Sequence, residues 1–375
     1  MKEEMKMLTS RERLLRSIRH EPIDRVPIST YELAGFNPEA WENREPSYKK
    51  LMDAIREYTD CIYMTSNLDT IPRPANMHDK KEWDEKTRHF TQRVYHSPKG
   101  DLTTLHRVDQ GIYTTWTLKH MLEDITDIDK YLSMPYEPEE IDMTRFYRDQ
   151  EALGSKGLMM ITVDDPICVA AELFEMGTFL TYAIVEPEKI KYLLDALHER
   201  QMHDLRGILK HNVKDVIFRV CGPEYATPPY MSPRYFYDYV TCYLIEICRE
   251  IKEAGGIPRI HCHGKIGKVI EQFAMTDADG LDPIEAPPDG DIALAEVKSM
   301  YGKKFCLFGN IELRELECSD RPRIDLLVRE AMDAAKEGSG FVLMPTSAPL
   351  NAPLSKKTEE NYLQMFESAL KYGAY

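Results

Sequence analysis

The chain has 375 residues, of which 43% are apolar and 30% charged, and its formal net charge is −15. These values are typical of a soluble globular protein, and the negative charge argues against a nucleic-acid partner or an anionic membrane surface, because both would repel the chain. The eight cysteines have no framework spacing, no apolar run reaches transmembrane length, and the charged start shows no export signal. Reduced thiols in a cytoplasmic protein are therefore expected.

The first elements are marked by clear start and stop signals. Thr9 and Glu12 have the spacing of a capping box and predict a helix that ends before Pro22. The segments Val26–Ser29 and Cys61–Ser66 are predicted to be short strands, with a helical stretch around Tyr48–Tyr58 between them.

Residues 67–120 differ in character from the rest of the chain. The stretches 88–95 and 102–108 alternate in polarity on either side of a Ser-Pro-Lys-Gly turn, which predicts a β-hairpin. This part is too short to form its own core, so we expect an excursion from one larger domain that spans residues 1–375.

From Gly157 onward, strands and helices are predicted to alternate regularly. The predicted strands are Leu158–Val163, Val216–Val220, Ile257–His261, Gly280–Ile284, Lys304–Phe308 and Gly340–Met344. The predicted helices are Ala170–Met176, Pro187–Lys210, Pro233–Ala254, Lys265–Met275, Ile292–Met300 and Arg323–Glu337, with Ser232 as the N-cap of the third.

Together with the two early strands, this pattern predicts eight strands that alternate with helices. Eight βα units in a chain of this length predict a single α/β domain, a (β/α)₈ TIM barrel with an N-terminal helix, whose site lies at the C-terminal ends of the strands. A doubly wound sheet is the alternative, but no Gly-x-Gly-x-x-Gly turn follows a strand, so a dinucleotide fold gains no support.

The segment from Ile257 to Lys265 carries the strongest functional signal. Alternate side chains of a strand point the same way, so His261 and His263 are expected to face one site while Cys262 faces away. Two imidazoles at the C-terminal end of a strand, followed by Gly264, occupy the position where an α/β barrel places its chemistry. A hydrogen-bonded core histidine is the alternative interpretation of either residue.

Polar groups follow six consecutive predicted strands, which favours one shared pocket. Among them, Asp164, Glu285 and Asn310 are candidate catalytic residues, and Glu224, Tyr225 and Ser347 are candidate substrate-binding residues.

Imidazole, thiolate and carboxylate are the ligands of catalytic zinc, so His261, His263 and Cys221 form a candidate metal set, with Glu285 as an alternative third ligand.

Several motifs, in the same order along the chain, resemble the uroporphyrinogen decarboxylase superfamily. They are Thr9–Leu15, Glu21–Pro27, Ser97–Leu102, Asp165-Pro166, Ile260–Gly264, Phe308–Ile311 and Lys371–Gly373. The resemblance implies a (β/α)₈ barrel, a possible homodimer, and membership of one of two branches, the porphyrinogen decarboxylases or the corrinoid-linked methyltransferases.

Departures from the superfamily pattern favour the methyltransferase branch. The decarboxylases carry arginines after the first strand that hold substrate carboxylates, whereas this chain has Pro27–Phe36 there, with no arginine and with Glu32. Some methyltransferases bind zinc through His-x-Cys and a distant Cys. Here His261-x-His263 stands at the first position and Ser347 falls where the distant Cys is expected.

Three hypotheses follow from the sequence. The first is methyl transfer between a small methylated substrate, such as a methoxylated compound, and the corrinoid (cobalamin) of a partner protein, with zinc as a second cofactor. The second is a decarboxylase or lyase of a small carboxylic acid that uses Asp164 or Glu285 with a histidine as an acid–base pair. The third is a non-catalytic ligand-binding barrel.

Overall fold

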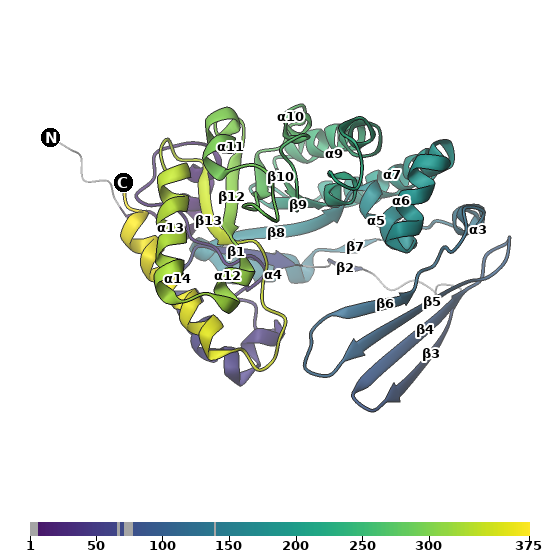
Figure 1. Cartoon of the computed structure of the whole chain (residues 1–375), viewed down its shortest axis with the longest axis horizontal. Coiled ribbons are helices and arrows are strands. Elements are labelled where there is room, and N and C mark those ends of the chain that lie inside the picture. The colour runs from purple at the N-terminus through teal and green to yellow at the C-terminus, as the bar shows by residue number, and fades with distance from the viewer. Residues whose placement is uncertain (1–6, 66–67, 71–77, 139) are drawn as a thin grey trace.

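The computed structural model describes residues 7–65, 68–70, 78–138 and 140–375 and places seven parallel strands in one curled sheet (Figure 1). In sheet order the strands are β1 (Cys61–Thr65), β8 (Gly157–Asp164), β9 (Ile217–Cys221), β10 (Ile257–Cys262), β11 (Gly280–Pro283), β12 (Cys306–Ile311) and β13 (Phe341–Pro345). The six strands predicted from residue 158 onward are confirmed, as is the one at 61–65; Ser66 lies outside the described residues. A curled parallel sheet with helices on its outside is a TIM-barrel-like α/β fold.

The predicted strand at 26–29 is reduced to a single bridge. Ile28 bridges Leu343 of β13 in parallel, and its carbonyl oxygen accepts a hydrogen bond of 2.7 Å from the backbone N–H of Asp60, just before β1. The segment therefore lies between the two edge strands of the sheet. It does not extend as a strand because Tyr31 has a φ of +56°, a left-handed conformation that ends extended backbone.

Helices cover the outer face of the sheet (Figure 1). The α-helices of the described residues are α1 (Ser10–Ile18), α2 (Lys49–Tyr58), α3 (Asp127–Ser133), α4 (Thr144–Leu153), α5 (Pro166–Leu173), α6 (Met176–Val185), α7 (Pro187–Leu209), α8 (Pro233–Phe236), α9 (Cys242–Glu253), α10 (Ile270–Phe273), α11 (Leu294–Tyr301), α12 (Leu313–Cys318), α13 (Arg321–Ala335) and α14 (Lys356–Tyr372), and α3 lies apart from the main sheet, against α7 and β5 (Leu102–Asp109). The predicted capping box of α1 is present, with Thr9 and Glu12 each bonding the other's backbone. Within the described residues, no single helix is long and apolar enough to cross a membrane. The helices α5 and α6 reach that length and apolar content only when taken together, and they are bent by 114° relative to each other.

Several helix predictions need correction. The helix predicted at 170–176 begins four residues earlier, because the Asp165 side chain accepts the backbone N–H of Cys168 and caps α5. The helix predicted at 265–275 forms only as α10, since Gly264 has a φ of +84° and delays the helix. The predicted helix at 233–254 is divided into α8, a π-turn and α9, and the Ser232 side chain makes no capping bond.

The excursion is larger than the predicted hairpin. The predicted pair, β4 (Arg88–Tyr95) and β5 (Leu102–Asp109), is present, and β3 (His78–Glu85) and β6 (Thr115–Lys119) extend it to a four-stranded antiparallel sheet set apart from the main sheet (Figure 1). A small pair, β2 (Asp69–Thr70) and β7 (Ile141–Asp142), is separate. β3 escaped prediction because an edge strand needs no alternating apolar face and its sequence is mostly charged. Residues 67 and 71–77 of the excursion lie outside the described residues.

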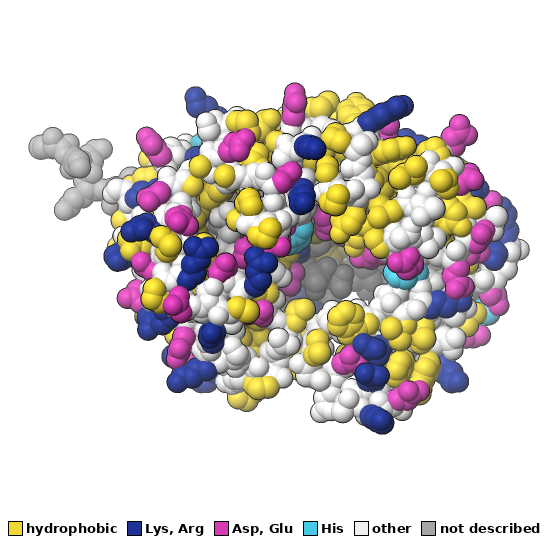
Figure 2. All heavy atoms as spheres, viewed as in Figure 1, with side chains coloured by type: hydrophobic (Ala, Val, Ile, Leu, Met, Phe, Trp, Pro, Cys, Tyr) yellow, Lys and Arg dark blue, Asp and Glu magenta, His cyan; other side chains and the backbone are white. Residues whose placement is uncertain are grey.

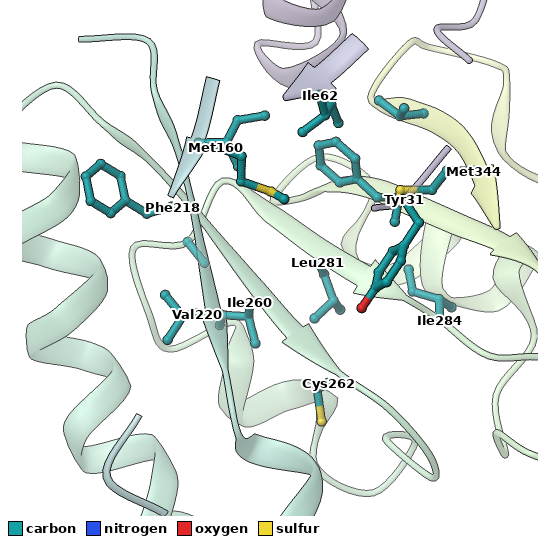
Figure 3. Packing of buried hydrophobic residues seen from close by; sticks show 14 of the residues in the cluster. Tyr31, Ile62, Met160, Phe218, Val220, Ile260, Cys262, Leu281, Ile284 and Met344 are labelled. Atoms are coloured by element: carbon teal, nitrogen blue, oxygen red, sulfur yellow. The ribbon is translucent and has the colours of Figure 1, made fainter. Parts of the chain in front are cut away.

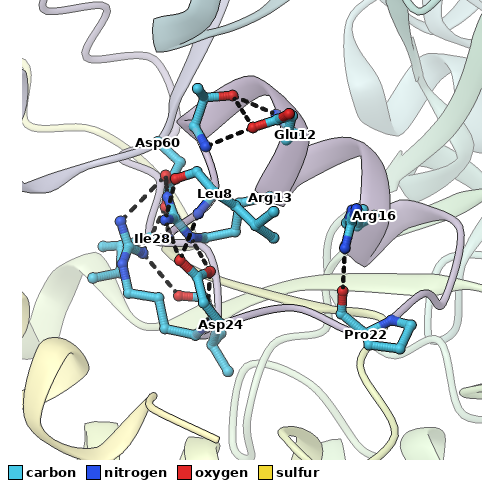
Figure 4. A network of polar contacts seen from close by, with 11 residues as sticks. Leu8, Glu12, Arg13, Arg16, Pro22, Asp24, Ile28 and Asp60 are labelled. Atoms are coloured by element: carbon cyan, nitrogen blue, oxygen red, sulfur yellow. Dashed lines mark hydrogen bonds and ion pairs between the residues drawn. The ribbon is translucent and has the colours of Figure 1, made fainter. Parts of the chain in front are cut away.

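A buried ionic cluster joins the N-terminal region to the start of β1 (Figure 4). Asp60 is completely buried and accepts hydrogen bonds from Arg13 at 2.6 Å, from Arg25 at 2.7 Å and from the backbone N–H of Ile28 at 3.0 Å. Arg13 also donates twice to Asp24, each time at 2.7 Å. The cluster therefore holds the segment around Ile28 against the edge of the sheet.

Candidate functional site

Strand register places four ionisable side chains in one row across the sheet. Asp164 of β8 is opposite Cys221 of β9, Cys221 is opposite His261 of β10, and His261 is opposite Asp282 of β11. Partners in a parallel register project from the same face. Cys262 packs in the apolar core, as the predicted alternation of β10 requires (Figure 3).

His261 lies inside this row and is 3% exposed. Its Nδ1–H donates to Oδ2 of Asp282 at 2.8 Å, and its Nε2 lies 3.3 Å from the hydroxyl of Tyr31. Burial outweighs Asp282 and lowers the pKa of His261 to about 3, so the ring is neutral. Asp282 is buried too, but Arg259 and His261 hold its pKa down at about 2.

Tyr31 connects His261 to a buried arginine. Figure 3 shows its hydroxyl directed toward the middle of the curled sheet. Arg219 donates from NH2 to the Tyr31 oxygen, and its NH1 lies 3.5 Å from Glu32. Arg219 is 8% exposed and its Nε has no hydrogen-bond partner. The Arg219 guanidinium is thus a buried cation with weak compensation.

His263 differs from His261 because it reaches a cavity. Its Nδ1–H donates to Oε1 of Glu285 at 2.8 Å, while Oε2 of Glu285 accepts the backbone N–H of Gly264 at 2.6 Å. Burial lowers the pKa of His263, but Glu285 and Glu224 outweigh it, and the net shift is upward. The imidazole is therefore protonated more readily than an ordinary histidine, with Nε2 left for a ligand.

The cavity has a volume of about 640 Å³ and lies beside the C-terminal ends of β9, β10 and β11. It is lined by His120, Ala171, Glu172, Phe174, Glu175, Met176, Glu224, Tyr225, Thr227, Pro228, Pro229, Tyr230, His263, Gly264, Lys265, Glu285 and Asp289. In the space-filling view the molecule is hollowed between the main body and the antiparallel sheet, with histidine and acidic side chains on the rim (Figure 2). This volume suits a small molecule.

The predicted site residues divide between the cavity and its surroundings. Four of them line the cavity: Glu224, Tyr225, His263 and Glu285. The others, Asp164, Cys221, His261, Asn310 and Ser347, lie outside its described lining. The side-chain amide of Asn310 instead donates to the backbone oxygen of Ile284 at 3.1 Å. Burial raises the pKa of Asp164.

Glu224 is positioned by the glycine before it. Gly222 has a φ of +127°, and a Cβ there would lie 2.1 Å from Oδ1 of Asp165. Only glycine therefore lets the backbone pass this close to Asp165 at the N-terminus of α5, and this path places Glu224 at the cavity wall. Oε2 of Glu224 is buried without a hydrogen-bond partner, and burial raises the pKa of this carboxyl.

Other site residues were missed from the sequence. Arg259 lies two residues before His261 in β10, so strand periodicity could have placed it on the inner face. Tyr31 and Arg219 are 188 residues apart and meet only through the fold. Glu172, at the end of α5, carries no signal in the sequence that would place it in the cavity.

The family follows from comparison with known proteins. A family model described as uroporphyrinogen decarboxylase (URO-D) matches residues 118–356. The chain belongs to this family. The predicted resemblance is thereby confirmed. Comparison with curated protein sequences finds no match. Among solved structures, a methyltransferase from Methanosarcina mazei is similar, with a TM-score of 0.61 and 15% sequence identity over 97% of this chain and 99% of that one.

The predicted zinc set does not fit the side chains of this URO-D family member. Nε2 of His261 faces the Tyr31 hydroxyl, to which Arg219 donates, so the position that a dication would take holds a phenol bound to a cation. Burial raises the pKa of the Cys221 thiol, which disfavours the thiolate that zinc needs. In the described part of the chain, no group of three or more His, Cys, Asp or Glu side chains, including any with His263, is arranged to hold a metal ion.

A carboxyl next to the site predicts a pH-dependent stability. Burial first, and then the charge of Glu285, raise the pKa of Glu312 to about 7, from an ordinary value of 4.5. The cost of ionising Glu312 in the folded state is therefore absent below pH 4.5 and grows as the pH rises to about 7. Relative to wild type, Glu312→Gln should gain about 1–2 kcal/mol of unfolding free energy at pH 8 but little at pH 5, after discounting for partial exposure.

Urea unfolding followed by circular dichroism at both pH values measures this difference. Glu330→Gln, on the exposed side of α13, is the matched control and should show no dependence on pH. An equal gain for Glu312→Gln at pH 5 and pH 8 would show that Glu312 is not perturbed in the folded protein.

Proposed function

We propose that this URO-D family member is a methyltransferase that moves a methyl group from a small methylated substrate to the corrinoid of a partner protein. The observation that carries the proposal is the cavity at the strand ends, where a readily protonated His263 stands beside carboxyl and tyrosine side chains. The similarity of this fold to that of a methyltransferase from Methanosarcina mazei supports the proposal. None of the cavity's described lining residues is a serine or cysteine, so a nucleophile supplied from outside suits the site.

The residues of the chain would bind and orient the methyl donor. Held by Glu285 at Nδ1, His263 can donate a hydrogen bond from Nε2 to an oxygen of the donor. Tyr225 and Phe174 would pack against its carbon atoms and exclude water. The corrinoid, when bound, would supply a cobalt(I) nucleophile.

One observation favours the second candidate, a carboxy-lyase. Arg219 is a buried guanidinium that donates to Tyr31, has a free Nε and forms its one ion pair among the described residues with Glu32 at 3.5 Å, and such a group would hold a substrate carboxylate. The cavity argues the other way, because Lys265 is the lone lysine or arginine among its described lining residues, against five carboxyl groups. An anionic acid would be repelled there, so we rank this function second.

A single assay separates the candidates. The purified protein is mixed with cob(I)alamin and, in turn, with methoxylated arenes, methylated amines and small carboxylic acids. Methyl transfer is expected to change the visible spectrum to that of methylcobalamin with at least one methylated donor. Release of carbon dioxide from an acid without cobalamin would support the carboxy-lyase instead, and no reaction with any compound would favour a binding protein.

A further inference from the structure

We propose that the methyl donor carries its methyl group on a cationic nitrogen, as a methylated ammonium compound. This inference rests on the proposed function and narrows its substrate class. It starts from the state of the five carboxyl groups that line the cavity, because a carboxylate that already has a partner offers little to a ligand.

Three of these five carboxyl groups are already engaged. Glu285 pairs with His263 at 2.8 Å, and Asp289 pairs with Arg314 at 3.0 Å. Glu175 caps α6 by accepting the backbone N–H of Thr178 at 3.0 Å. These residues keep the wall negative but have roles in the fold.

The other two, Glu172 and Glu224, form no ion pair in the described part of the chain. Oε2 of Glu224 is buried without a hydrogen-bond partner although it belongs to a residue that lines the cavity. A carboxylate held out of water without an ion-pair partner is costly, and the positive charge of a cationic ligand would offset that cost. Burial, the largest cause, raises the pKa of both carboxyls, and the nearby His120 and His263 only partly offset it.

The rest of the lining suits a methylated cation better than a metal ion or a bare ammonium group. Tyr225, Tyr230 and Phe174 supply aromatic rings, and Ala171 and Pro228 supply apolar contacts. Aromatic rings with nearby carboxylates are the usual recognition of quaternary ammonium groups, which donate no hydrogen bonds. Lys265 is exposed and has no ion-pair partner among the described residues, so it could hold a polar end of the same ligand.

The chemistry of transfer agrees with this donor class. The carbon–nitrogen bond breaks with its electron pair left on nitrogen, and cobalt(I) supplies the pair of the new carbon–cobalt bond and becomes formally cobalt(III). The amine leaves neutral, so no proton is needed. Because the positive charge on nitrogen fades toward the transition state, the carboxylates bind the donor rather than accelerate its reaction. Their removal should raise KM without lowering kcat.

Binding of choline and of its neutral isostere, 3,3-dimethylbutan-1-ol, tests the inference by isothermal titration calorimetry on the full chain. The wild type should bind choline about tenfold more tightly than the isostere. Glu172→Gln and Glu224→Gln should each remove most of this preference and leave binding of the isostere unchanged. Glu253→Gln, on the exposed end of α9, is the matched control and should bind both as the wild type does. Equal binding of the two compounds by the wild type would overturn the inference.

Measuring methyl transfer to cob(I)alamin by the same wild-type and variant proteins tests the ammonium donor and the methyltransferase function independently of each other. Choline preference without methyl transfer from any donor would uphold the cation site and contradict the methyltransferase. Methyl transfer from a methoxylated arene, with no choline preference and no transfer from an ammonium donor, would uphold the methyltransferase and overturn the ammonium donor.

Discussion

Replacing Asp60 by alanine is expected to lower the free energy of unfolding by about 3–5 kcal/mol. The carboxylate is completely buried and takes hydrogen bonds from Arg13, Arg25 and the backbone N–H of Ile28. Its removal leaves two guanidinium groups short of a partner, one of them 5% exposed, and frees a backbone N–H that joins the 25–29 segment to the sheet. Urea unfolding measured by circular dichroism gives the difference directly.

Asp53→Ala is the matched control. Asp53 also contacts two cations, Lys49 and Arg56, each at 2.6 Å, but it lies on the exposed face of α2, where water replaces the lost contacts. Its midpoint of unfolding should stay at the wild-type value. If Asp60→Ala proved as mild as Asp53→Ala, the buried cluster would not be what holds the 25–29 segment in place.

Replacing His263 by glutamine is expected to lower kcat/KM for methyl transfer about 10- to 100-fold with any donor that has an oxygen at this position. A hydrogen bond from a charged donor contributes about 1.5–3 kcal/mol, and glutamine offers a neutral one of similar reach. The side chain is one-third exposed at the cavity wall, so its loss should not unfold the protein. The measurement is the rate of methylcobalamin formation, with the circular dichroism spectrum as the check on folding.

His211→Gln is the control for this variant, because His211 is exposed in the loop before β9, at the opposite end of the strand from the cavity. Its rate should equal that of the wild type. A folded His263→Gln variant with wild-type kcat/KM would show that His263 does not contact the donor, although Glu285 holds it at the cavity wall.

Short-range patterns decided much of what could be predicted about this protein. A strand has a side-chain period of two, so the positions of His261, Cys262 and His263 followed from their spacing alone, and the structure agrees. The capping box at Thr9 is equally local, since both partners lie within three residues. The order of the motifs along the chain was enough to indicate the URO-D family, which the match over residues 118–356 confirms.

Tertiary structure decided which of these residues meet, because distant segments carry no record of each other in local patterns. His261 and His263 share a face, yet the Tyr31 turn covers His261 while His263 opens to the cavity. The same turn places the Tyr31 hydroxyl, which accepts a hydrogen bond from Arg219, at Nε2 of His261, an arrangement that does not suit the predicted zinc set and that spacing cannot reveal. Glu172 becomes a cavity wall only because α5 packs against the turn Pro223–Ala226 that follows β9, and this contact is a property of the packed molecule.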